Sequence, residues 1–248
     1  DTFALLPTGG GKSICFQVPA LVQDGICLVI SPLIALMKDQ VQNLQKRNIS
    51  AVAIYSGMHY RDIDRILDNC IYGDVKFLYL SPERLVSDLA IERIKQMKVN
   101  LLAVDEAHCI SQWGYDFRPP YLRIAEIREW LPNVPVMALT ATATPRVVTD
   151  IQEQLAFQNG QFFQQSFTRQ NLAYVALAED NKLGKLLEIL TNVKGSAIVY
   201  VRSRKRTKEA AQLVQQKGMA AAHYHAGLGT ELRSAKQDAW INNQVRVM

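Results

Sequence analysis

The segment FALLPTGGGKSICFQVPAL, residues 3–21, decides the fold that this sequence predicts. Its start, Phe3–Leu6, is a short apolar run typical of a buried strand, and three consecutive glycines then separate this run from a helical stretch. Glycines let backbone N–H groups close around a phosphate group, and the N-terminus of a helix adds a positive dipole. A turn that needs only flexibility is the alternative, and the Lys-Ser pair directly after the glycines disfavours it. The segment therefore predicts a strand–turn–helix unit that binds phosphate.

The turn keeps the end of the phosphate-loop pattern but not its start. That pattern begins with a glycine, and Leu6 occupies the corresponding position. Lys12 would reach the β- and γ-phosphates of a nucleotide, and the Ser13 hydroxyl would bind Mg²⁺. The predicted nucleotide-binding residues are Pro7, Thr8, Gly9, Gly10, Gly11, Lys12 and Ser13.

Short apolar runs rich in Val and Ile recur along the chain, and segments with helical spacing lie between most of them. Runs that are apolar throughout and alternate with helices indicate a parallel sheet covered on both faces. The sequence therefore predicts the α/β class, with a parallel sheet flanked by helices. Further strands are expected at Ile26–Ile30, Ala51–Tyr55, Val75–Leu80, Leu101–Val104 and Val134–Leu139, and helices at Leu33–Arg47 and Tyr121–Leu131.

The pattern restarts after a polar and aromatic stretch, Gln161–Leu177, which we interpret as the join between two domains. We place the first domain at residues 1–165 and the second at residues 166–248. The second domain is expected to contain helices at Lys182–Leu190, Arg206–Gln216 and Glu231–Ile241 and strands at Ala197–Val201 and Ala221–Tyr224. This array is unfinished, and we expect the chain to be a fragment of a longer protein.

The composition is that of a globular chain of 248 residues, of which 48% are hydrophobic. The net charge of +5 mildly favours a polyanionic partner. No apolar run approaches the roughly 20 residues that span a bilayer, and the first residues have no signal-peptide pattern, so no membrane partner is expected. The four cysteines lie far apart in the sequence and favour buried, reduced thiols of a cytosolic protein over a zinc site or disulfides.

Two adjacent carboxylates, Asp105 and Glu106, follow the apolar strand in the segment NLLAVDEAH, residues 100–108. A carboxylate at the C-terminal end of a parallel strand lies at the ligand-binding edge of the sheet. Asp105 would hold Mg²⁺ directly or through water, and Glu106 would polarise the attacking water. His108 is a candidate link to a neighbouring domain, with a structural histidine as the alternative. An ordinary helix N-terminus would also favour the acidic pair, but together with the phosphate loop the pair favours a nucleotide site.

The same segment continues as DEAHCISQWGYDFRPPY, residues 105–121, and becomes aromatic within a few residues. Trp113, Phe117 and Arg118 are typical of a surface that grips flat ligands, with packing of the aromatics in the core as the alternative. Gly114 and the Pro-Pro pair indicate a loop, and loops seldom bury aromatics in series. The sequence thus predicts an aromatic ligand surface close to the carboxylates.

These motifs resemble those of superfamily 2 helicases, and more narrowly those of the RecQ family of DNA helicases. LLPTGGGKS resembles motif I, VISPLIALMKDQV motif Ia, LYLSPERL motif Ib, VDEAH motif II, MALTATATP motif III and AIVYVRSRKRT motif IV. The sequence DEAH also occurs in RNA helicases. DEAHCISQWGYDFRPPY is narrower, because it resembles the aromatic-rich loop of RecQ helicases, which senses single-stranded DNA.

The resemblance implies an ATP-dependent DNA helicase with RecA-like domains, the second only begun in this chain, and with ATP and Mg²⁺ as cofactors. It implies 3′ to 5′ translocation on single-stranded DNA, unwinding of partly duplex DNA, and a role in recombination and repair. Such a protein would lie in the cytoplasm at a bacterial nucleoid, or in the nucleus of a eukaryote. The resemblance leaves protein partners open.

The resemblance also implies roles for single residues. Those acting in hydrolysis would be Lys12, Asp105, Glu106 and His108, with Ser13 and Asp105 as the Mg²⁺ ligands. Those binding DNA or coupling it to ATP would be Ser111, Gln112, Trp113, Asp116, Phe117, Arg118, Thr140 and Thr142. The aromatics could stack on bases, at roughly 1–3 kcal/mol per base. Arg118 could meet a phosphate or the carboxylates of the ATP site, the two threonines could relay or simply cap, and Ser31 could contact a DNA phosphate or cap a helix.

Motifs that the resemblance leads us to expect before Asp1 and after Met248, among them an adenine-reading motif and an arginine finger, are not in the sequence. We therefore expect the longer protein to unwind DNA and this chain alone not to. Two alternatives stay open. One is a DEAH-type RNA-remodelling ATPase, which the aromatic loop disfavours, and the other is a helicase-like module that holds nucleic acid or ATP without hydrolysis.

Overall fold

The computed structural model describes residues 1–114, 116–168 and 171–248. The chain divides into two compact units, residues 1–169 and 170–248, and each is described by itself. The boundary expected from the sequence, at 165/166, lies a few residues earlier. It falls within the segment that follows the last strand of the first unit.

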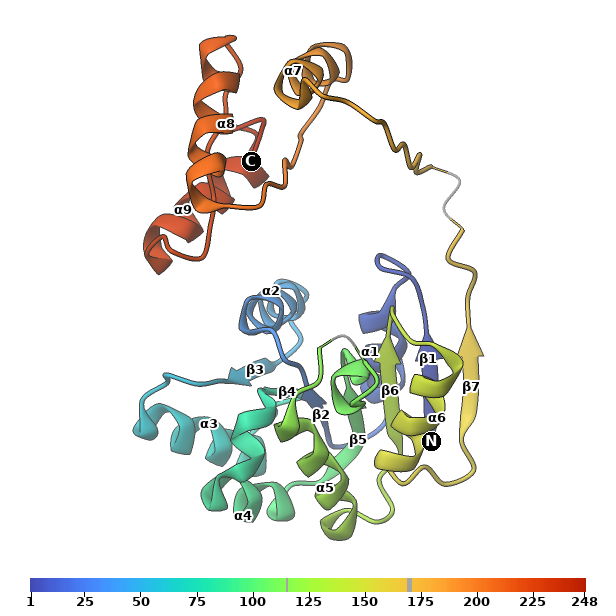
Figure 1. Cartoon of the computed structure of the whole chain (residues 1–248). Helices are drawn as coiled ribbons and strands as arrows, with labels where there is room; N and C mark the ends of the chain where they lie inside the picture. The colour runs from blue at the N-terminus through green and yellow to red at the C-terminus, as the bar shows by residue number, and fades with distance from the viewer. Residues whose placement is uncertain (115, 169–170) are drawn as a thin grey trace. The chain divides into compact units, whose positions relative to one another are not determined.

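The first unit is built on a seven-stranded sheet with the order β3-β4-β2-β5-β6-β1-β7 (Figure 1). Every pair of neighbouring strands is parallel. The strands are β1 (Thr2–Leu5), β2 (Ile26–Ile30), β3 (Ala51–Ile54), β4 (Phe77–Leu80), β5 (Val99–Val104), β6 (Val136–Thr140) and β7 (Gln161–Gln164). The predicted α/β class with a parallel, RecA-like sheet is confirmed.

Helices cover both faces of this sheet. The helices are α1 (Lys12–Val22), α2 (Ile34–Gln45), α3 (Tyr60–Tyr72), α4 (Asp88–Gln96), α5 (Ile124–Trp130) and α6 (Pro145–Gln154), with 3₁₀ turns η1 (Pro82–Val86), η2 (Ala107–Ile110) and η3 (Pro119–Arg123). One buried cluster joins α1 and α2 to the sheet through residues such as Phe16 and Met37. The other cluster packs the helices α3, α4, α5 and α6 on the sheet, through residues such as Leu67 and Val147. The helix predicted at Tyr121–Leu131 is in fact split between η3 and α5.

The central strands are apolar throughout because both of their faces are buried. Every residue of β2 and β4 is buried, with Leu28 in one cluster and its neighbour Val29 in the other. This arrangement places the carboxyl ends of β1, β5 and β6 along one edge of the sheet. In parallel sheets that edge is where ligands bind.

The segment Gln161–Leu177, predicted as the join, begins as the edge strand of the first sheet. β7 pairs with β1, and the ring of Phe162 lies 5.7 Å from that of Phe3. The described residues between β7 and Leu177 form no strand.

The second unit contains three helices among its described residues, α7 (Lys182–Asn192), α8 (Arg204–Gln216) and α9 (Thr230–Ile241). The prediction of strands at Ala197–Val201 and Ala221–Tyr224 is wrong, because neither segment forms a strand. Ala197 and Ala221 each form a single parallel bridge with Val247. A strand needs consecutive pairs, and Val247 lies between the two segments and offers one pair to each. No helix in the described residues is long and apolar enough to cross a membrane.

Candidate active site

The turn between β1 and α1 has the backbone that its glycines allow. Gly9 and Gly11 have φ values of 77° and 81°, in the left-handed region that side chains disfavour. The N–H of Gly10 donates to the Pro7 carbonyl at 2.8 Å, and a Cβ at Gly10 would lie 2.8 Å from that oxygen. Each of the three glycines is therefore required by the shape of the turn.

Lys12 and Ser13 form the first turn of α1, where the backbone N–H groups and the helix dipole face an incoming anion. Gly11 is the N-cap, and no side-chain hydrogen bond caps this helix in the described chain. The N-terminus of α1 therefore has the geometry that phosphate binding would require.

Asp105 follows the last residue of β5 and is only 5% exposed. One carboxylate oxygen accepts the N–H of Glu106 at 3.0 Å, and the other accepts the hydroxyl of Ser31 at 3.3 Å. The phenol of Tyr121 donates to the Asp105 carbonyl at 3.1 Å. Burial and the neighbouring charge of Glu106 raise the pKa of Asp105 to about 6. A nearby cation would act in the opposite direction and lower this pKa.

Ser31 therefore has a role that the sequence alone did not reveal. It directly follows β2, which pairs with β5, and its hydroxyl donates to the Asp105 carboxylate. It is not a helix cap, since α2 begins at Ile34 with Leu33 as its N-cap. The signal was available, because the carboxyl ends of neighbouring parallel strands meet at one edge of a sheet.

Glu106 has a left-handed backbone, with φ 47° and ψ 46°, which is uncommon for a residue other than glycine. One of its carboxylate oxygens lies 3.3 Å from Nδ1 of His108. The hydrogen bond from His108 lowers the pKa of Glu106 and keeps the carboxylate charged. The same Nδ1 lies 2.8 Å from the Thr140 hydroxyl oxygen.

The phosphate loop and the carboxylates lie close enough to interact electrostatically. The positive charge of Lys12 acts to lower the pKa of both Asp105 and Glu106, although burial outweighs it at Asp105. Strand order explains this proximity, because β1 and β5 both flank β6. Two motifs about a hundred residues apart in the sequence thus form one site.

The donors present fit Mg²⁺. The ion favours a few oxygen ligands from the protein together with substrate phosphates. Asp105 and the Ser13 hydroxyl are such donors. The described residues contain no cluster of three or more His, Cys, Asp or Glu side chains able to hold a metal by themselves.

The loop after η2 presents Trp113 to solvent at 59% exposure, so this indole does not pack in the core. Gln112 and Asp116 are exposed, and Phe117 is half-buried. Gly114 cannot carry a side chain here, because a Cβ would lie 2.6 Å from the His108 carbonyl. Tyr115 lies outside the described residues.

Ser111 was predicted to bind or sense DNA, but its side chain is fully buried. Its hydroxyl accepts the N–H of Trp113 at 3.2 Å, so in this structure the side chain holds the backbone of the loop. Thr140 is also fully buried and contacts His108. Thr142 joins this hydrogen-bond network through its backbone, because its N–H donates to the Thr140 hydroxyl at 3.2 Å.

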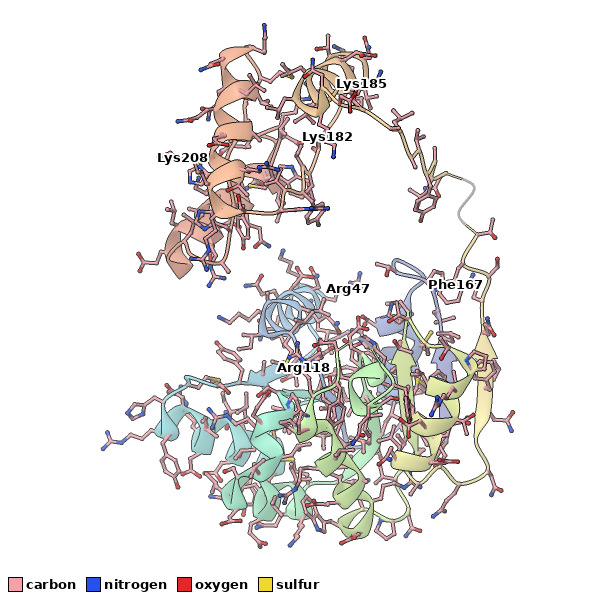
Figure 2. The ribbon with its side chains drawn as sticks, in the orientation of Figure 1. Arg47, Arg118, Phe167, Lys182, Lys185 and Lys208 are labelled. Carbon is pink, nitrogen blue, oxygen red and sulfur yellow. The ribbon has the colours of Figure 1, made fainter. Side chains whose placement is uncertain are left out.

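Arg118 lies at the edge of the sheet beneath α2 in Figure 2. Its guanidinium pairs with Asp116 at 3.0 Å and donates to the Pro32 carbonyl at 3.3 Å. Arg118 is thus paired within its own loop, and among the described residues neither Asp105 nor Glu106 forms an ion pair with it.

One residue that the sequence did not single out contacts the predicted DNA loop. The guanidinium carbon of Arg146, in the first turn of α6, lies 3.4 Å from the centre of the Trp113 ring. No local pattern predicts this contact, because β6 and the segment after it separate the two residues in the sequence.

Comparison with known protein families identifies a helicase profile. The profile of the DEAD/DEAH box helicase family matches residues 1–151, which cover the phosphate loop, the carboxylates and the aromatic loop.

Comparison with individual proteins points to one group. The chain is 39% identical over 249 residues to an ATP-dependent DNA helicase RecQ of Pasteurella multocida, covering all of this chain and 39% of that protein. It is 42% identical over 250 residues to an ATP-dependent DNA helicase RecQ of Bacillus subtilis, covering all of this chain and 42% of that protein. It is 37% identical to the RecQ-like DNA helicase blm-1 of Caenorhabditis elegans, covering 26% of that protein. The chain thus spans about two fifths of the length of the two bacterial relatives.

Solved structures share the fold. The Mycobacterium smegmatis helicase Lhr, solved with single-stranded DNA and AMP-PNP, matches 99% of this chain and 37% of its own, with a TM-score of 0.70 and 19% identity. Dbp5 of S. cerevisiae, solved with Gle1, matches all of this chain and 63% of its own, with a TM-score of 0.73 and 17% identity.

Proposed function

This chain belongs to the DEAD/DEAH box helicase family and resembles RecQ helicases over its whole length, and from this premise we propose that it is the ATP-hydrolysing part of a DNA helicase. The observation that carries the proposal is the shared edge of the sheet. There the phosphate loop, the carboxylate pair and the base of the aromatic loop all meet within one unit.

In the proposed reaction, the backbone of the glycine turn and Lys12 bind the phosphates of ATP. Ser13 and Asp105 would hold Mg²⁺, which neutralises charge on the phosphates when it is bound. Glu106, kept charged by His108, orients and polarises the attacking water. His108 also contacts Thr140, so a change at Glu106 can pass to the segment that follows β6.

The polymer is proposed to be DNA, and its site to include the aromatic loop. Trp113 has an open ring surface on which an unpaired base can stack whatever its identity. The loop begins directly after the catalytic segment, and its glycine packs against the His108 carbonyl. Movement of Trp113 on DNA would therefore act on the backbone of a residue of the ATP site.

The finer properties are also proposals, supported by the similarity to RecQ helicases. They are translocation 3′ to 5′, unwinding of partly duplex DNA, and action in recombination and repair. The location would be with DNA, at the bacterial nucleoid or in a eukaryotic nucleus.

The test is to measure ATP hydrolysis by the full-length protein with matched single strands of DNA and RNA. We expect hydrolysis to rise strongly with DNA and weakly with RNA. Stimulation by RNA alone would favour the RNA-remodelling alternative. If the protein binds ATP but does not hydrolyse it with either DNA or RNA, the alternative of a helicase-like module that binds ATP or nucleic acid without hydrolysis is favoured.

A further inference from the structure

Arg146 and Trp113 form a contact between two elements that flank the nucleotide site. The guanidinium carbon of Arg146 lies 3.4 Å from the centre of the indole ring. Trp113 nevertheless remains 59% exposed, so Arg146 leaves much of the ring open to solvent. The contact holds the indole in place and leaves a surface on which a flat ligand can stack.

The charge of Arg146 is not neutralised by a carboxylate. No ion pair involves Arg146 in the described ranges 1–114, 116–168 and 171–248, whereas Arg118 in the same region pairs with Asp116 at 3.0 Å. Arg146 also lies in the first turn of α6, where the helix dipole disfavours a cation. An exposed arginine in this setting gains most from an anion supplied by a ligand.

Trp113 and Arg146 each follow, in the sequence, one of two residues that contact each other at the candidate nucleotide site. Trp113 lies just after His108 in the chain, and Arg146 lies just after Thr140. His108 and Thr140 are in contact at 2.8 Å. The segment after His108 and the segment after Thr140 are in contact a second time, where Arg146 stacks on Trp113. A ligand bound to Trp113 and Arg146 would therefore contact both segments.

We propose that Trp113 and Arg146 form one subsite for a nucleotide of single-stranded DNA, in which a base stacks on the open indole surface and the Arg146 guanidinium binds the adjoining phosphate. This inference rests on the proposed function, and it adds Arg146 as a DNA-binding residue. The subsite would not select a base, because every base has a stacking face and the phosphate is common to all.

The first experiment measures binding of a fluorescent oligo-dT strand to the full-length protein by anisotropy over a series of salt concentrations. Arg146→Ala should weaken binding about tenfold, as expected when a charged hydrogen bond is lost. It should also lower the slope of log affinity against log salt by about 0.7, which corresponds to one phosphate contact on a single strand. Arg146→Lys should keep the slope, because it keeps the charge.

The matched control is Lys98→Ala. Lys98 precedes β5 at the opposite edge of the sheet and has a side chain that is 76% exposed, so this variant removes the same charge far from the subsite. It should leave both the affinity and the slope unchanged.

The second experiment repeats the titration with an abasic strand of equal length, which retains the phosphates but lacks the bases. Trp113→Ala should weaken binding of oligo-dT and leave the abasic strand nearly unaffected, whereas Arg146→Ala should weaken both. If Arg146→Ala binds oligo-dT as tightly as the wild type, or more tightly, with an unchanged slope, the proposal is overturned. Tighter binding would mean that Arg146 competes with the base. A full-length wild type that binds no DNA would overturn the proposed function as well.

Discussion

The imidazole Nδ1 of His108 lies 2.8 Å from the hydroxyl oxygen of Thr140. The same nitrogen lies 3.3 Å from a carboxylate oxygen of Glu106. Because Nδ1 carries at most one proton, it can donate that proton to only one of these oxygens at a time. His108 is therefore a common partner of Glu106, the proposed catalytic carboxylate, and of Thr140, which precedes the segment leading to α6.

Lys12→Ala should abolish ATP hydrolysis in the full-length protein, because the ammonium that would bind the β- and γ-phosphates is lost. Steady-state phosphate release measures this. Lys98→Ala, which removes an exposed lysine at the other edge of the sheet, should hydrolyse ATP normally. Normal turnover by Lys12→Ala would refute the assignment of the phosphate loop.

Glu106→Gln should slow hydrolysis by about 10²–10⁴-fold while ATP still binds, since the amide cannot accept a proton from water. Phosphate release and titration with a fluorescent ATP analogue separate the two effects. Glu153→Gln, at an exposed position on α6, is the control and should be as active as the wild type. Equal losses of binding and turnover in Glu106→Gln would assign this residue to nucleotide binding instead.

Thr140→Val should preserve hydrolysis without DNA and reduce its stimulation by single-stranded DNA roughly fivefold or more, in the range of typical coupling between sites. Valine keeps the shape of this buried residue but removes the hydroxyl that contacts His108. ATPase rates with and without DNA give the ratio. Thr149→Val on α6, where the hydroxyl donates to the Pro145 carbonyl of the same helix, should keep full stimulation. An unchanged ratio in Thr140→Val would exclude this hydroxyl from the coupling.

Asp1→Ala should lower the free energy of unfolding by about 3 kcal/mol, because it leaves Arg128 buried without its partner. Their side chains are 4% and 10% exposed and lie 3.1 Å apart. Asp1 also accepts the N–H groups of Val136 and Gln158, at 2.8 Å and 2.7 Å. Urea denaturation measures the change.

The control for this ion pair is Asp24→Ala. The Asp24 side chain is 95% exposed and lies 3.8 Å from Lys98, so its loss should change stability by less than about 0.5 kcal/mol. Equal effects of the two substitutions would show that burial does not set the strength of the Asp1–Arg128 pair.

The sequence predicts those parts of the site that local patterns specify. The glycine turn needs left-handed backbone at Gly9 and Gly11, and only glycine adopts it readily, so the pattern can be read directly. Asp105 and Glu106 are recognisable because they end an apolar strand. Both inferences need only neighbouring residues.

Other features depend on which segments meet in space, and local patterns do not specify this. The sequence predicts a join that includes Gln161–Gln164, but these residues form β7, in which Phe162 packs on Phe3 and the strand pairs with β1 of the first sheet. The segments at Ala197 and Ala221 have the composition of strands, yet each forms only one bridge, with Val247. The contact of Arg146 with Trp113 likewise requires the folded sheet to bring α6 beside the loop.

The central claim is that the aromatic loop reports the presence of DNA to the ATP site. The most direct test is the ATPase activity of full-length Trp113→Ala, measured with and without single-stranded DNA and accompanied by a titration of ATP binding. We predict that ATP binding and basal hydrolysis stay close to the wild type while most of the stimulation by DNA is lost. Hydrolysis that remained fully stimulated by DNA would contradict the coupling role of this loop.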